Sequence, residues 1–128
     1  MTWPPRWITH DVERVSNKAQ DAIDFIDVFG LITKDSISGK AGAKMLLRDW
    51  QRDLIRNIYA QDEAGGFLRR FALVGVPRKN GKSALASHLA VFDLFFGPAG
   101  GETYSVAATR DQARIVFGEA KRIVEWNE

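Results

Sequence analysis

One short stretch in the second half of the chain, VGVPRKNGKSALASHL at residues 74–89, constrains the fold more than any other. It joins an apolar run to a helical pattern through a turn that ends in Gly81, Lys82 and Ser83. Such a turn between a buried strand and a helix N-terminus is typical of phosphate-binding loops, because backbone N–H groups and the helix dipole point at the anion. The full pattern G-x-x-x-x-G-K-[ST] requires a glycine where this chain has Val76, so the match is incomplete.

The apolar pattern predicts the elements around this turn. Helical spacing predicts helices over residues 11–29, 47–59, 83–96 and from 109 onward. Short apolar runs predict strands over 67–76 and 102–108. Loops and turns are expected at 31–44, at Gly65-Gly66 and at GPAGG. Gly30 is expected to stop the first helix, and Thr109 with Gln112 forms a capping box for the last. The second half therefore predicts the beginning of a doubly wound α/β domain.

Composition limits the classes of protein that fit this pattern. The chain has 128 residues, 45% hydrophobic and 27% charged, the profile of one soluble globular domain. It has no cysteine, which excludes disulfides and thiolate metal sites, and His10 and His88 have no ligand spacing around them. A net charge of +2 permits a polyanionic partner without requiring one. No apolar run approaches membrane-spanning length and no signal peptide is present, so a cytosolic protein is expected.

The residues of the turn have distinct expected roles in holding a nucleotide. Gly81 allows close approach of the backbone, Lys82 reaches the β- and γ-phosphates, and the Ser83 hydroxyl ligates Mg²⁺. Val76 and Pro77 are held extended, and Pro77 offers no N–H, so the cradle must come from later residues. The expected nucleotide-binding residues of the turn are Pro77, Lys79, Asn80, Gly81, Lys82, Ser83 and Ala84, with Arg78 as a further cation. The alternative is an ordinary polar turn that caps a helix.

Three segments together resemble a known family: VGVPRKNGKSAL, AATRDQARIVFGEAKRIVE and the upstream LLRDWQRDLIRNIYA. They resemble the N-terminal ATPase region of the large terminase subunit of tailed bacteriophages, in the branch found in actinobacterial phages. The resemblance runs from about Phe25 to the last residue. It implies a P-loop ATPase of the additional-strand, catalytic-glutamate class, followed by a nuclease domain. The implied function is the ATP-driven packaging of double-stranded phage DNA into a procapsid.

The resemblance also implies cofactors, partners and residue roles. The cofactors are ATP and Mg²⁺. The partners are the portal protein, the small terminase subunit and further copies in a ring, in the host cytoplasm and transiently at the procapsid portal, with no membrane. By position, Lys82 and Arg78 are the catalytic cations, Arg78 acting on the γ-phosphate, and Ser83 holds the metal. Gln51 matches a glutamine that contacts adenine, and residues 107–112, with Arg110, match a motif that couples the nucleotide site to DNA.

Each of these roles has a plainer alternative. Arg78 and Arg110 could be solvated charges, and Gln51 could be a polar position on an amphipathic helix. Trp50, beside Gln51, is expected in the core rather than as a stacking platform. A small-molecule kinase would need an arginine lid and an acceptor pocket, and neither is evident in the sequence.

Hydrolysis requires an acidic residue at the end of a strand, and none is found. Asp93 and Glu125 end apolar runs, but both runs belong to predicted helices. The sequence therefore predicts a helical segment over 1–66, which carries the Trp-Gln pair, and the first part of a P-loop ATPase over 67–128. The acidic strand and the nuclease domain are expected to be absent, so the isolated chain should not hydrolyse ATP. A truncated or split-gene product that binds nucleotide or DNA without turnover is the alternative.

Overall fold

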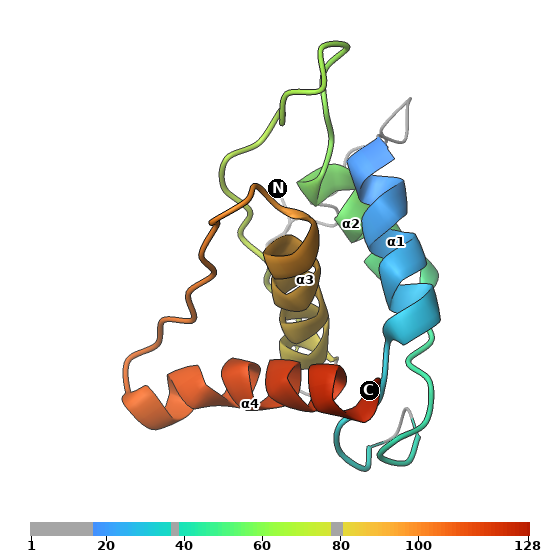
Figure 1. Cartoon of the computed structure of the whole chain (residues 1–128), viewed down its shortest axis with the longest axis vertical. Helices are drawn as coiled ribbons and strands as arrows, with labels where there is room; N and C mark the ends of the chain where they lie inside the picture. The colour runs from blue at the N-terminus through green and yellow to red at the C-terminus, as the bar shows by residue number, and fades with distance from the viewer. Residues whose placement is uncertain (1–16, 37–38, 78–80) are drawn as a thin grey trace, which may run out of the picture. The chain divides into compact units, whose positions relative to one another are not determined.

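The computed structural model describes residues 17–36, 39–77 and 81–128, and the regular structure within these ranges is helical (Figure 1). The helices are α1 (Asn17–Phe29), α2 (Asp49–Ile58), α3 (Lys82–Phe96) and α4 (Arg110–Trp126). The chain divides into two compact units, residues 1–24 with 47–74 and residues 25–46 with 75–128. The boundary between the units falls within α1, so this helix contributes to both.

In the first unit, the chain after α2 turns back through a tight turn. The predicted Gly65-Gly66 turn is present, since the Asp62 N–H donates to the Gly66 carbonyl at 2.8 Å. Beyond the turn, the ring of Phe67 lies edge-on against Tyr59, with 6.2 Å between the ring centroids. This contact between two aromatic rings fixes where the chain leaves the turn.

In the second unit, α3 and α4 pack on one another (Figure 1). Their buried apolar side chains are Leu85, Val91, Phe92 and Ile123. The last turn of α1 adds Phe25, whose ring centroid lies 5.7 Å from that of Phe92 and 5.7 Å from that of Phe96. The core of this unit is therefore formed by one face of α3, one face of α4 and the end of α1.

The connection after α1 is confirmed as a loop, and its start is set by Gly30. The Gly30 N–H donates to the Ile26 carbonyl at 2.7 Å and α1 ends there. The loop then forms an irregular hairpin, in which the Ile32 N–H donates to the Ala43 carbonyl at 2.8 Å. The predicted helix over 11–29 is present from Asn17, and its first six positions lie outside the described residues.

The two predicted strands are absent from the described residues. Residues 71–77 and 102–107 have no ladder hydrogen bonds, and the bridge that begins the first segment, between Gln61 and Phe67, is isolated. A strand is stabilised by a neighbouring backbone as well as by its own apolar residues. The pattern of Phe71, Leu73 and Val106 is that of a strand, but these side chains are 91%, 92% and 89% exposed. The described part of the chain thus does not confirm the α/β class.

The helices are also less buried than their patterns predict. α3 is apolar on most sides, which is typical of a buried helix, yet Leu94, Phe95 and Phe96 at its C-terminal end are exposed. On α4, Ile123 of the apolar stripe is buried while Phe117 is exposed. Within the described ranges, α3 and α4 contact mainly one another and the end of α1, so a further apolar face of each helix remains in solvent.

Candidate functional site

The turn that begins α3 has the backbone conformation of an anion-binding site. Gly81 precedes the helix with φ 75° and ψ 20°, in the left-handed region that glycine adopts without strain. Its carbonyl accepts the first helical hydrogen bond, from Leu85 N–H at 2.9 Å. The N–H groups of residues 82–84 therefore have no acceptor within the helix and lie at the positive end of its dipole. We name residues 81–84 the α3 turn.

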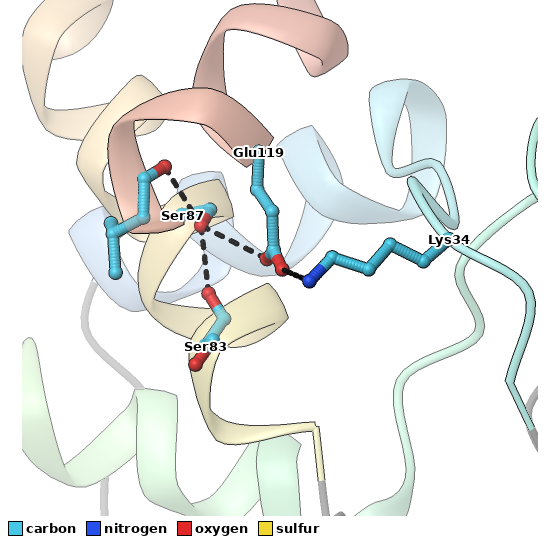
Figure 2. A network of polar contacts seen from close by, with 5 residues as sticks. Lys34, Ser83, Ser87 and Glu119 are labelled. Atoms are coloured by element: carbon cyan, nitrogen blue, oxygen red, sulfur yellow. Dashed lines mark hydrogen bonds and ion pairs between the residues drawn. The ribbon is translucent and has the colours of Figure 1, made fainter. Parts of the chain in front are cut away.

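The two side chains expected to bind the nucleotide lie on the first turn of α3. Lys82 is exposed and Ser83 is half-buried. The Ser83 carbonyl accepts a hydrogen bond from the Ser87 hydroxyl at 2.7 Å, whereas its own hydroxyl points away from Ser87 (Figure 2). Ala84 lies in the same turn and Pro77 is exposed ahead of it, while Arg78, Lys79 and Asn80 lie outside the described residues.

Behind the α3 turn lies a polar cluster that the sequence analysis did not identify: Lys34, Ser87 and Glu119. The Ser87 hydroxyl is 3.3 Å from Glu119 Oε2 and 3.2 Å from the Val116 carbonyl, both on α4. Lys34 Nζ lies 3.7 Å from Glu119 Oε1 (Figure 2). No local pattern marks Glu119, and only the packing of α4 on α3 shows that it is buried.

His88 joins α3 to the loop after α1 in the same unit. Its Nδ1 lies 2.6 Å from the Ala84 carbonyl, and its Nε2 accepts a hydrogen bond from the Leu31 N–H at 3.1 Å. An Nε2 acceptor requires the neutral ring with its proton on Nδ1. Burial lowers the pKa of His88, against opposing effects of the Ala84 carbonyl and of Glu119. This role could not be predicted from the sequence, because the Leu31 N–H lies 57 positions away along the chain.

Gln51 has a structural role at the start of α2. Its side chain is buried, and its Oε1 accepts a hydrogen bond from the Arg48 N–H at 2.9 Å, which satisfies a backbone donor that precedes the helix. The amide NH₂ group of Gln51 takes no part in this bond. Trp50 is not in the core, because 38% of its surface is exposed, so that expectation was wrong.

The predicted N-cap of α4 is confirmed. Thr109 is the N-cap residue, and its hydroxyl accepts a hydrogen bond from the Gln112 N–H at 3.2 Å. Arg110 is exposed in the first turn. This position suits either a solvated charge or a contact with a polyanion.

The described residues contain neither a candidate metal-binding cluster nor a candidate membrane-spanning helix. No group of three or more histidine or acidic side chains that could hold a metal ion occurs among the described residues. No helix in the described ranges has the length and apolar character needed to cross a membrane.

Together, a left-handed glycine, a lysine and a serine at the first turn of a helix define the phosphate-binding element of a P-loop nucleoside triphosphatase. Comparison with known proteins gives the family. A family model described as "Terminase large subunit, ATPase domain" matches residues 49–128. The chain belongs to this family, as the sequence resemblance predicted.

Two curated relatives agree with this assignment. The chain is 47% identical over 57 residues to proteins described as "Terminase, large subunit" from Thermus phage G20c and from Thermus virus P23-45. The match covers 44% of this chain and 11% of each relative. The chain therefore spans a small part of the length of these relatives. No solved structure matches it.

Proposed function

We propose that the chain is the ATP-binding part of a phage DNA-packaging motor. The observation that carries this proposal is the α3 turn, with Lys82 and Ser83 after a left-handed Gly81, in a chain of the terminase ATPase family. An exposed lysine beside unpaired N–H groups suits the β- and γ-phosphates of ATP. The Ser83 hydroxyl, which points away from Ser87, would supply one ligand for Mg²⁺ (Figure 2).

The remaining roles extend this site. Lys79, Asn80 and Ala84 would add N–H groups around the phosphates, after Pro77, which has none. Arg78 would stabilise charge on the γ-phosphate during transfer. Gln51 would contact adenine through its amide NH₂ group, while its oxygen caps α2. The segments 67–76 and 102–108 would become strands of the α/β sheet when paired with further strands, which their apolar pattern supports.

We propose partners that match such a motor. Double-stranded DNA would contact the exposed Arg110 at the start of α4, since a phosphate contact needs an accessible cation. The portal protein, the small terminase subunit and neighbouring copies in a ring would surround the chain in the host cytoplasm, at the procapsid portal.

Turnover is expected to need an acid that these residues do not provide. Asp93 and Glu125 lie on α3 and α4, and Glu125 pairs with Lys121 at 3.5 Å. Neither follows a strand beside the α3 turn, where a carboxylate would organise Mg²⁺ and water. We therefore expect the 128-residue chain to bind ATP and not to hydrolyse it faster than a Lys82→Ala variant.

Nucleotide binding tests the proposal directly. Lys82→Ala should weaken ATP binding in the presence of Mg²⁺ by at least about tenfold, because a charge-assisted hydrogen bond to phosphate is lost. Isothermal titration calorimetry of the 128-residue chain measures this change. Lys121→Ala is the matched control, since Lys121 is an exposed lysine on α4 and should leave the affinity unchanged. Equal affinity in wild type and Lys82→Ala would remove the nucleotide proposal.

A further inference from the structure

The Lys34–Ser87–Glu119 cluster places a carboxylate directly behind the α3 turn. Ser87 is fully buried one helical turn after Ser83, and its hydroxyl lies 2.7 Å from the Ser83 carbonyl. The same hydroxyl lies 3.3 Å from Glu119 Oε2. One hydroxyl group therefore separates the carboxylate of α4 from the first turn of α3 (Figure 2).

The hydroxyl of Ser87 connects the two helices. It has a single proton and faces three acceptors, the carbonyls of Ser83 and Val116 and the carboxylate of Glu119. The Ser83 carbonyl belongs to α3 and the other two acceptors belong to α4. A shift of α4 would thus change the hydrogen bonding of the residue that carries the expected Mg²⁺ ligand.

The charge of Glu119 needs a partner at this position. Its side chain is only 8% exposed, and a buried carboxylate is costly unless it is paired. Lys34, which is 62% exposed, approaches it from the loop after α1 at 3.7 Å. Without Lys34, a negative charge would stand behind a turn whose expected ligand is itself strongly negative, and the two would repel.

We propose that Glu119 is a positioning residue for the α3 turn, acting through Ser87, and that Lys34 neutralises Glu119 so that its carboxylate does not repel the bound phosphates. The proposal rests on the proposed function, since it concerns the same nucleotide. It assigns roles to three residues outside the Gly-Lys-Ser motif. None of the three needs to touch the nucleotide.

A double-mutant cycle tests the role of Lys34. Lys34→Met keeps the apolar stem and removes the charge, and it should weaken the binding of ATP with Mg²⁺ by roughly tenfold through the unbalanced carboxylate. Lys34→Arg should retain wild-type affinity. Adding Glu119→Gln to Lys34→Met should restore affinity to within about twofold of Glu119→Gln alone, because no charge is then left to repel the phosphates.

Restored ATP affinity in the double variant distinguishes charge neutralisation by Lys34 from direct binding of the phosphates by Lys34. If Lys34 bound the phosphates itself, Glu119→Gln would not restore the affinity of Lys34→Met, and the proposal would be overturned. Wild-type affinity in Lys34→Met would also overturn it. Glu125→Gln is the matched control, because Glu125 is an exposed carboxylate of α4 paired with Lys121, and it should have no effect.

Ser87→Ala tests the positioning step and does not threaten the helix, since alanine is the best helix former. It should weaken ATP binding severalfold in the presence of Mg²⁺ and clearly less in its absence, because the misplaced group is the metal ligand. If Ser87→Ala weakens ATP binding equally with and without Mg²⁺, or does not weaken it, Ser87 does not position the metal ligand.

The two proposals can fail separately. If wild type and Lys82→Ala bind ATP equally, the nucleotide proposal fails. If Lys82→Ala weakens binding and only the Lys34 and Ser87 effects are missing, this inference fails alone.

Discussion

At the residue scale, the side chain of His88 links the α3 turn to the loop after α1. It is fully buried, and both ring nitrogens are used, by the Ala84 carbonyl and by the Leu31 N–H. Protonation of the ring would place a second proton on Nε2, where the Leu31 N–H already donates. The folded chain therefore requires the neutral ring, which agrees with the lowered pKa of this histidine.

A lowered pKa makes stability depend on pH in one direction. In the unfolded chain His88 should titrate near its ordinary value of about 6.5, so below that pH the unfolded state binds more protons than the folded state. The stabilisation is fully present above about pH 6.5 and is lost as the pH falls from there towards the folded pKa. The melting temperature should therefore decrease between about pH 7.5 and 5.5.

A variant of His88 isolates this effect. In His88→Gln the decrease of melting temperature over that pH range should be much smaller, although the variant is less stable at neutral pH. A His88→Gln variant with the full pH dependence would show that other groups cause it.

At the scale of single elements, Gln51 at the start of α2 has an observed structural role and a proposed functional role. The oxygen of its amide accepts the Arg48 N–H, and only the NH₂ group is left for a base. Gln51→Ala removes both groups and should cost about 1 kcal/mol of stability through the lost cap, so it cannot separate the roles. Gln51→Glu keeps an acceptor oxygen and removes the NH₂ donor.

Gln51→Glu should therefore leave the melting temperature close to that of wild type and weaken the binding of ATP and of GTP alike. The physical reason is that the amide NH₂ group donates to N7, which is an acceptor in both adenine and guanine, whereas a carboxylate has no donor. Calorimetric titration with each nucleotide, on wild type and variant, measures the two affinities. Unchanged affinities in Gln51→Glu would show that Gln51 only caps the helix.

The helices could be predicted because their signals are local. Gly30 ends α1 and Thr109 begins α4 through contacts within four residues along the chain, so the sequence alone contains them. The α3 turn belongs to the same class, since the conformation of Gly81 depends on its missing side chain. The resemblance to the terminase family then predicted the roles of Lys82 and Ser83 in binding phosphate and Mg²⁺.

Features that depend on contacts between distant residues were not predicted, because no local signal marks them. The burial of Glu119 and His88 results from contacts with residues tens of positions away, which no local pattern encodes. The two strands were predicted but are not present in the described residues. Their apolar pattern is that of a strand, but these residues contain no neighbouring strand with which either segment pairs. Local patterns thus indicate what an element can bury, and tertiary contacts decide whether it is buried.

At the scale of the whole molecule, the chain exposes an unusual amount of apolar surface. Phe71, Leu73 and Val106 are almost completely exposed in segments without regular structure. The end of α1, α3 and α4 also line an open apolar pocket of about 250 Å³, with Phe29, Phe95 and Val124 at its surface. Contiguous apolar surface and unpaired backbone favour association with other chains.

The chain alone should therefore be marginally stable and self-associate as its concentration increases. The apolar segment at 71–76 is expected to contribute most, because its backbone N–H and C=O groups are available for pairing along an extended run. Leu73→Lys places a charge on that segment and should shift the onset of association to a clearly higher protein concentration. Size-exclusion chromatography with light scattering measures the molar mass over the dilution series.

The matched control for this change is Leu46→Lys, because Leu46 is an 81% exposed leucine that lies outside that segment. It adds the same charge to the chain and should leave the association close to that of wild type. If both variants suppress association equally, net charge rather than the segment is responsible. A wild-type chain that stays monomeric and melts in one sharp, cooperative transition would show instead that the exposed apolar segments find partners within the chain itself, and that the sheet predicted from the sequence forms in solution.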